Sequence, residues 1–131
     1  MQIINVVITG SRDWQIDKAP KIWEALEDLQ EQYENDWHSP EFVLHHGVCP
    51  FGGADLIGAS WARGAGWIVV PHPPIKPVGW AFAKRNQEMI DLQPDYVIAC
   101  FLEGAGNKGT QMTVDMAVNA GLKDRIIEIW G

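Results

Sequence analysis

Short apolar runs alternate with amphipathic segments along the whole chain. The run Ile3–Thr9 is rich in β-branched residues and stops at Gly10, which is typical of a fully buried strand. Between residues 17 and 35, apolar residues recur at helical spacing, with Asp17 as the expected N-cap and Pro20 in the first turn. Further strands are predicted at 42–45, 67–70, 96–101 and 125–130, and further helices at 54–63, 82–92 and 109–119.

This alternation of strands and helices predicts an α/β fold, in which a five-stranded parallel sheet is covered by helices on both faces. Right-handed crossovers favour a doubly wound sheet with strand order 3-2-1-4-5. The 131 residues have the size of one domain, so residues 1–131 are predicted to form a single domain. Ligands of such sheets bind beyond the carboxyl ends of the strands, here where the order reverses between the first and fourth strands.

The loops that follow the first four strands are rich in glycine, and several lead directly into a predicted helix. Glycine lets backbone amides approach a ligand closely, and a helix N-terminus attracts anions. We therefore expect a site for a phosphate-bearing small molecule at this edge. The candidate ligand-binding residues are Gly10, Ser11, Arg12, Gly47, Cys49, Pro50, Gly52, Gly53, Ala54, Asp55, Arg85, Asn86, Gly104, Gly106, Lys108, Gly109 and Thr110.

The distribution of charge supports an anionic ligand. The formal net charge is −7, but residues 16–36 alone hold seven acids and two bases, a charge of −5. Outside that segment, half of the eight bases lie in or next to the candidate loops; these are Arg12, Lys84, Arg85 and Lys108. The acidic total therefore describes an outer helix face, while the expected site is locally basic. A nucleic-acid partner is disfavoured, because such binding requires a basic surface.

Several other classes are disfavoured by missing signals. The pattern Gly104-x-Gly106-x-x-Gly109 matches the dinucleotide fingerprint in letters, but it follows the fourth strand rather than the first. The spacing of His, Cys and acidic residues matches no zinc site, and we expect neither metal nor cofactor. With no membrane-spanning run, no signal peptide and two cysteines, we expect a cytoplasmic protein with no membrane partner. Seven tryptophans leave a homo-oligomer open.

Four motifs in chain order resemble the SLOG superfamily, in particular its YspA/YpsA-like branch. They are Gly10-Ser11-Arg12, His46-Gly47-x-Cys49-Pro50-x-Gly52-Gly53-Ala54-Asp55, Arg85-Asn86-x-x-Met89 and Gly106-x-x-Gly109-Thr110. The resemblance implies a Rossmann-like three-layer αβα fold and a nucleotide or nucleotide-derived ligand such as an ADP-ribose-like molecule. For a ligand-binding protein of this kind we expect the first and last motifs to hold a phosphate, and Arg85 and Asn86 to close the site. Asp55, which follows a glycine-rich turn at a helix start, either caps the helix or binds a ribose hydroxyl.

The same resemblance leaves three functions open. The first is a sensor or ligand-binding protein. The second is a nucleoside 5′-monophosphate N-glycosidase like the LOG-type phosphoribohydrolases, in which Arg85 matches a catalytic arginine. The glutamate that these enzymes carry after Gly109-Thr110 is missing, so Asp55 or Glu88 would supply the carboxylate. The third, DprA-like binding of single-stranded DNA, is the least favoured at this net charge.

Overall fold

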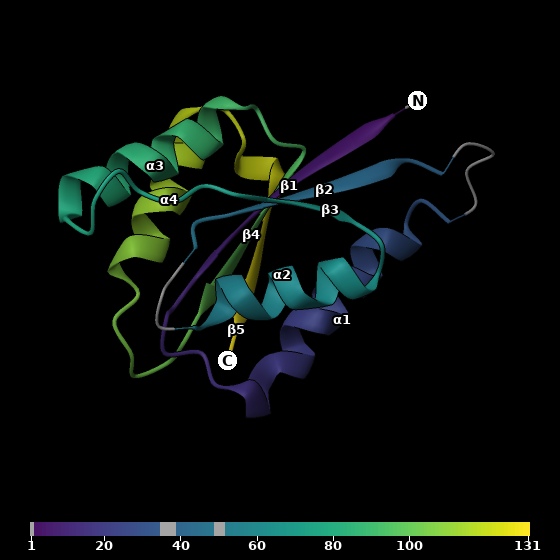
Figure 1. Ribbon diagram of the computed structural model, residues 1–131, viewed down its shortest axis with the longest axis horizontal. Helices are drawn as coiled ribbons and strands as arrows, with labels where there is room; N and C mark the ends of the chain where they lie inside the picture. The colour runs from purple at the N-terminus through teal and green to yellow at the C-terminus, as the bar shows by residue number, and fades with distance from the viewer. Residues whose placement is uncertain (1, 35–38, 49–51) are drawn as a thin grey trace.

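The computed structural model describes residues 2–34, 39–48 and 52–131 of the chain (Figure 1). The strands are β1 (Ile3–Gly10), β2 (Glu41–His46), β3 (Ile68–Pro71), β4 (Tyr96–Phe101) and β5 (Ile126–Trp130). The helices are α1 (Ala19–Glu31), α2 (Ala54–Gly64), α3 (Gly79–Asp91) and α4 (Lys108–Asn119), with 3₁₀ turns at Ile16–Lys18 and Lys123–Arg125.

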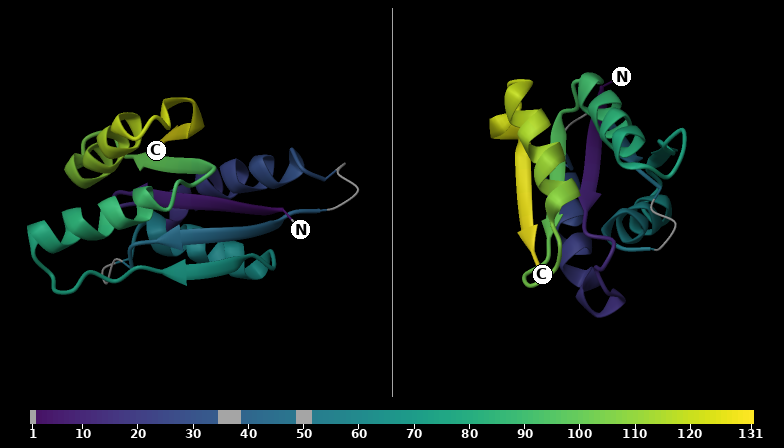
Figure 2. Two further views of the ribbon diagram at one scale, coloured as in Figure 1. Left: turned by 90° about the horizontal axis from the view of Figure 1, so that it is seen from above. Right: turned by 90° about the vertical axis from the view of Figure 1, so that its left-hand side faces the viewer.

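The five strands form one parallel sheet in the order β3-β2-β1-β4-β5, which confirms the predicted topology. Figure 1 shows α1 and α2 on one face of the sheet and α3 and α4 on the other, so the fold is a Rossmann-like α/β sandwich. In Figure 2, β5 (yellow) and β3 (teal) lie at the two edges. The strand order reverses between β1 and β4, as predicted.

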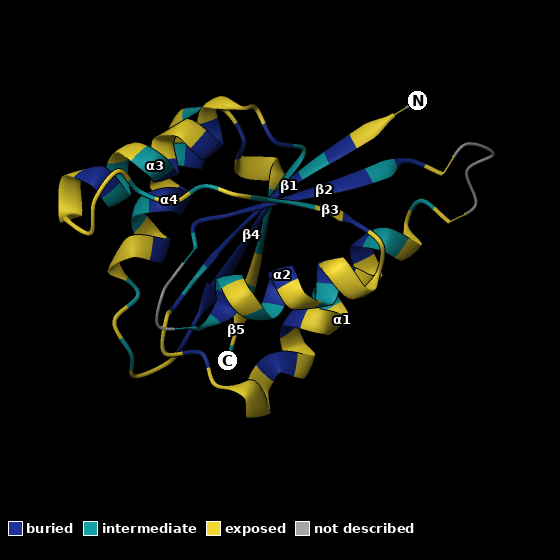
Figure 3. Cartoon of the chain, viewed as in Figure 1, coloured by how far each residue is buried: buried dark blue, intermediate teal, exposed yellow. Residues whose placement is uncertain are grey.

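Alternate residues of the strands fill two apolar layers, because a strand in a covered sheet presents side chains to both faces. Val6, Ile8 and Leu44 pack with α1 and α2, whereas Val7 and Val97 pack with α3 and α4. All five are fully buried. Figure 3 shows mostly buried residues in the central strands and exposed residues on the outer sides of the helices.

The first helix is shorter than the sequence predicted. It ends at Glu31 rather than near residue 35. The amides of Tyr33 and Glu34 donate hydrogen bonds to carbonyls only three residues back, at 3.1 and 3.2 Å, which replaces the α-helical pattern by 3₁₀-type turns. The expected N-cap was also wrong. Asp17 lies inside a 3₁₀ turn, and Lys18 takes the N-cap position without a side-chain cap, although Pro20 does sit in the first turn.

The third helix begins three residues earlier than predicted. Gly79, assigned to a loop by its residue type, opens α3 after the extended residue Val78, whose carbonyl accepts the amides of Ala81 and Phe82 at 3.0 and 3.1 Å. The bounds of the remaining elements agree with the prediction to within about one residue.

Backbone contact at the end of β1 positions the loops that follow it. Gly10 pairs with Cys100 of β4, and a Cβ on Gly10 would lie 2.5 Å from the Cβ of Ala54 and 2.7 Å from that of Cys100. Glycine therefore lets α2 approach the first strand closely. The Ser11 amide then donates to the Cys100 carbonyl at 3.2 Å, which extends the ladder by one residue.

Within residues 2–34, 39–48 and 52–131, no helix is both long enough and apolar enough to cross a bilayer. Cys100 carries a free and buried thiol, and burial raises the pKa of that thiol, with a smaller contribution from the nearby Asp55.

Candidate functional site

A cavity of about 390 Å³ opens at the carboxyl edge of the sheet, where the strand order reverses. It is bordered by the end of β1, the start of α2, one face of α3 and the first turns of α4. Ten of the predicted site residues line it: Gly10, Ser11, Arg12, Asp55, Arg85, Asn86, Gly106, Lys108, Gly109 and Thr110. Its described lining includes three basic side chains and one carboxylate, so the cavity is locally basic.

The other predicted residues lie around this cavity or away from it. Gly47, Gly52, Gly53, Ala54 and Gly104 do not line the cavity. Cys49 and Pro50 lie outside the described residues. Glu88 does not line the cavity: its side chain is 60% exposed, and its Oε1 lies 4.0 Å from the Nζ of Lys84, one turn earlier on α3. Asp55 is thus the one carboxylate among the described lining residues.

The loop after β1 is fastened to the start of α2. The Ser11 carbonyl accepts the amides of Trp14, at 3.3 Å, and of Ala54, at 3.1 Å, while the Ser11 hydroxyl accepts the amide of Asp13 at 3.1 Å. At Gly53, φ is +94°, and a Cβ would lie 2.5 Å from the Arg12 Cα. This glycine is required both by its backbone conformation and by the adjacent loop, and it places Arg12 beside the α2 N-terminus.

Arg85 is held by backbone carbonyls from two other loops. Its Nη1 donates to the Gly47 carbonyl, after β2, and to the His72 carbonyl at 3.2 Å, after β3. Its Nε donates to the Asn86 side chain at 2.7 Å, and the guanidinium lies 5.6 Å from the centre of the Phe82 ring. The arginine therefore joins α3 to these two loops while presenting positive charge to the cavity.

Asp55 is a buried carboxylate beside that arginine. Its Oδ2 accepts the amide of Gly47 at 3.1 Å. The residue as a whole keeps some exposed area, but Oδ1 has essentially none and finds no hydrogen-bond partner among the described residues. Burial raises the pKa of this carboxyl from 3.8 to about 6, against the opposing effects of the Gly47 amide and Arg85.

The loop between β4 and α4 is closed by a residue that the sequence did not single out. The Asn107 side chain accepts the amide of Leu102 at 3.0 Å and donates to the carbonyl of the same residue at 2.7 Å. Asn107 occupies the N-cap position of α4 but does not cap the helix with its side chain. Its engagement with Leu102 leaves the first amides of α4, next to Gly106 and Lys108, at the cavity.

Five lining residues were missed because they are strand or core residues in the sequence pattern. These are Ile8, Thr9, Phe82, Met89 and Met112. Met89 falls in the quoted Arg85-Asn86-x-x-Met89 motif, and the helical spacing of 82, 85, 86 and 89 places all four residues on one face of α3. That spacing was the available signal.

A second network lies behind Arg85. The two ring nitrogens of His45 bond to His72 Nε2 and Asn5 Oδ1, each at 2.9 Å. Burial lowers the pKa of His45 and of His72, so both rings favour the neutral form. Because the His72 carbonyl holds Arg85, the contact between the buried His45 and the partly buried His72 supports the arginine from the side of β3.

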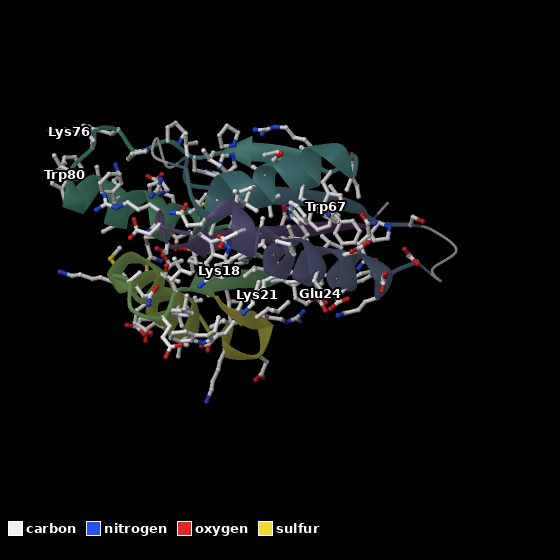
Figure 4. The ribbon with its side chains drawn as sticks, turned by 90° about the horizontal axis from the view of Figure 1, so that it is seen from below. Lys18, Lys21, Glu24, Trp67, Lys76 and Trp80 are labelled. Atoms are coloured by element: carbon white, nitrogen blue, oxygen red, sulfur yellow. The ribbon has the colours of Figure 1, made fainter. Side chains whose placement is uncertain are left out.

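Volume alone does not identify the site. A hollow of about 430 Å³ lies at the opposite, amino-terminal edge, among the end of α1, the start of β2 and Trp67. Its described lining residues include Glu34 and Glu41 but no basic side chain. Figure 4 shows Trp67 at the end of α1, far from Trp80 and Lys76 at the start of α3. Within the described ranges, no group of three His, Cys, Asp or Glu residues could hold a metal ion.

Comparison with known proteins identifies the family. Residues 4–75 match the family model described as the YspA, cpYpsA-related SLOG family, YAcAr. The chain belongs to this SLOG family. The match spans more than half of the chain and includes nearly all of β1, the loops that carry Arg12 and Gly53, and α2 with Asp55. No curated protein and no solved structure gave a significant match.

SLOG membership indicates nucleotide-related ligands in general terms. The matched segment contains the β1 and α2 side of the cavity, whereas Arg85 and Lys108 lie beyond it. The family match therefore covers the β1 and α2 side of the cavity but not the α3 and α4 side.

Proposed function

We propose that the cavity binds a nucleotide-derived ligand with a phosphorylated ribose, and that the protein acts as a sensor or ligand-binding protein. The observation that carries the proposal is the convergence of Arg12, Arg85 and Lys108 on one cavity at the strand-order reversal. The first turn of α4 adds amide dipoles to these charges. The family of the chain supports the same ligand class.

Each part of the cavity suits one part of such a ligand. Arg12 and Lys108 are exposed side chains at its rim and are the expected partners of a phosphate, together with the amides of Gly109 and Thr110. Phe82, Met89 and Met112 provide apolar and aromatic surface for a base. Arg85, fixed by the Gly47 and His72 carbonyls, lies between these parts as a preorganised cation.

The proposal is tested by calorimetric titration with AMP, ADP and ADP-ribose. Removing a charge-assisted bond to phosphate costs about 1.5–3 kcal/mol, so Arg12→Ala and Lys108→Ala should each weaken binding at least tenfold. Lys84→Ala is the matched control, because Lys84 carries the same charge near the site but lies on the outside of α3. Binding that is equally weakened by all three substitutions, or by none, would contradict the assignment.

Hydrolysis of the N-glycosidic bond is a second candidate. It is favoured by the presence of one buried carboxylate, Asp55, and one arginine, Arg85, in the same cavity. A carboxylate stabilises the oxocarbenium-like transition state, and water completes the reaction of AMP to adenine and ribose 5-phosphate. Release of adenine from AMP, lost in Asp55→Asn and retained in Glu88→Gln, would establish this activity. Absence of adenine release in the presence of measurable AMP binding would leave the binding function.

A further inference from the structure

One buried oxygen atom in the cavity wall makes no hydrogen bond with the described part of the protein. Asp55 Oδ1 is buried and lacks a hydrogen-bond partner among the described residues, while its sister Oδ2 accepts the Gly47 amide. A buried acceptor without a hydrogen-bond donor lowers the stability of the folded state, and such atoms are few in native proteins. Since Asp55 lines the cavity, a bound ligand is the natural source of the missing donor.

The groups around Asp55 narrow the chemistry of that donor. Gly47 contributes an amide from the β2 end, Arg85 a guanidinium from α3, and Cys100 a buried thiol from β4. Arg12 and Lys108 are the other charged groups in the described cavity lining. A phosphate against Asp55 would place two anions together, whereas Arg12 and Lys108 offer a phosphate opposite charge. The part of the ligand that meets Asp55 is therefore a neutral hydrogen-bond donor.

We propose that Asp55 Oδ1 accepts a hydrogen bond from a ribose hydroxyl, so that the site selects ribose over dideoxyribose. This inference rests on the proposed function, because it presupposes that a phosphorylated ribose enters the cavity. It goes beyond the expected ribose contact by naming the carboxylate oxygen that accepts the hydroxyl and the protonation state in which Asp55 acts. A hydroxyl suits this position because it donates one hydrogen bond without bringing charge.

Coupling to a proton follows from the environment of the carboxyl group. Burial holds the pKa of Asp55 near 6 in the unliganded protein, so a substantial fraction is protonated at pH 5. A protonated carboxyl with its proton on Oδ1 cannot accept the ligand hydroxyl there, and the binding-competent fraction falls accordingly. If only the carboxylate binds, affinity at pH 5 is about tenfold lower than at pH 7.5.

The experiment compares AMP with 2′,3′-dideoxy-AMP by calorimetry at pH 5.0, 6.0 and 7.5. Both ligands carry the same phosphate and base, so their own titrations and those of His45, His46 and His72 cancel in the affinity ratio. We expect AMP to bind at least tenfold more tightly at pH 7.5. The ratio should shrink towards one at pH 5.0. Repeating the titration in buffers of different ionisation enthalpy should show net proton release with AMP beyond that with the dideoxy analogue.

Two variants complete the test. Asp55→Asn should abolish both the AMP preference and its pH dependence, while Asp124→Asn, an exposed acid on the turn before β5, should preserve both. Equal affinity of the wild type for AMP and 2′,3′-dideoxy-AMP overturns this inference but leaves the proposed function standing. A preference for AMP that does not change with pH overturns the proton release. No binding of either ligand, with no effect of Arg12→Ala on ADP or ADP-ribose binding, overturns the proposed function itself.

Discussion

The guanidinium of Arg85 lies directly against the backbone of Gly47. Its Nη1 donates to the Gly47 carbonyl, and a Cβ on Gly47 would lie 2.5 Å from the Arg85 Cζ. The Gly47 amide meanwhile donates to Asp55. One glycine therefore sets the positions of both the cation and the carboxylate of the candidate site.

Substituting Gly47→Ala should separate ligand binding from stability. The new methyl group meets only the far end of a long side chain, which can swing aside, so we expect an unfolding free energy within about 1–2 kcal/mol of the wild type. Displacing the guanidinium should weaken binding of AMP or ADP-ribose at least tenfold. Urea unfolding and calorimetric titration measure the two effects. Gly64→Ala, at the far end of α2 with open space around its Cβ, is the control and should leave binding unchanged.

The adjacent glycines Gly52 and Gly53 should respond differently to alanine. Both have left-handed φ values, +93° and +94°, but no atom of the described residues lies within 4 Å of a Cβ on Gly52, whereas a Cβ on Gly53 would lie 2.5 Å from the Arg12 Cα. Gly52→Ala carries only the conformational cost, about 1 kcal/mol. Gly53→Ala adds overlap with backbone, for a loss of about 3 kcal/mol or more. Thermal unfolding of both variants measures the difference, and equal losses would show that the β1 loop moves aside freely.

The sheet order and the location of the cavity were predictable because each depends on periodicity and chain handedness. Buried β-branched runs mark the strands, and right-handed crossovers leave few orders for five parallel strands. The position of Arg12 and Lys108 at the cavity then follows from loops that leave the same edge of the sheet. No individual side-chain contact was needed for these conclusions.

The orientation of single side chains was not predictable from those patterns. Arg85 and Glu88 lie three residues apart on α3, yet one lines the cavity and the other lies on the outside beside Lys84. Which face of α3 meets the cavity is decided by the packing of Met89 and Ile90 against the sheet. The unpaired state of Asp55 Oδ1 depends on the exact approach of α2 to β1, which a one-dimensional pattern does not contain.

Asn107 should control the shape of the loop between β4 and α4. Its side chain both accepts from and donates to the backbone of Leu102, which is itself buried. Asn107→Ala leaves that amide and carbonyl without these partners, so we expect a loss of about 1–3 kcal/mol in stability. Because the same loop carries Gly106 and leads to Lys108, phosphate-dependent binding should weaken as well. Chemical denaturation and ADP titration measure both, and Asn119→Ala, at the exposed far end of α4, should affect neither.

The stability of the fold should depend on pH through Asp55. Its pKa is 3.8 ordinarily and about 6 in the folded protein, so between these values the folded state binds more protons than the unfolded state. Stability contributed by the protonated carboxyl is therefore present below about pH 4 and lost as pH rises through 6. The unfolding free energy lost in this way is on the order of 3 kcal/mol.

Asp55→Asn removes this titration while keeping the size of the side chain. Relative to the wild type, the variant should gain stability steadily from pH 4 to pH 7, with most of the gain complete near pH 7. The histidines with lowered pKa values, His45, His46 and His72, are common to both proteins and cancel in the difference. Urea unfolding at pH 4, 5, 6 and 7 measures it, with Asp124→Asn as the exposed control. If the difference in unfolding free energy between the variant and the wild type stays constant over this range, burial does not raise the pKa of Asp55. A rising difference, together with weaker AMP binding, would show that the protein gives up stability to keep a carboxylate in its site.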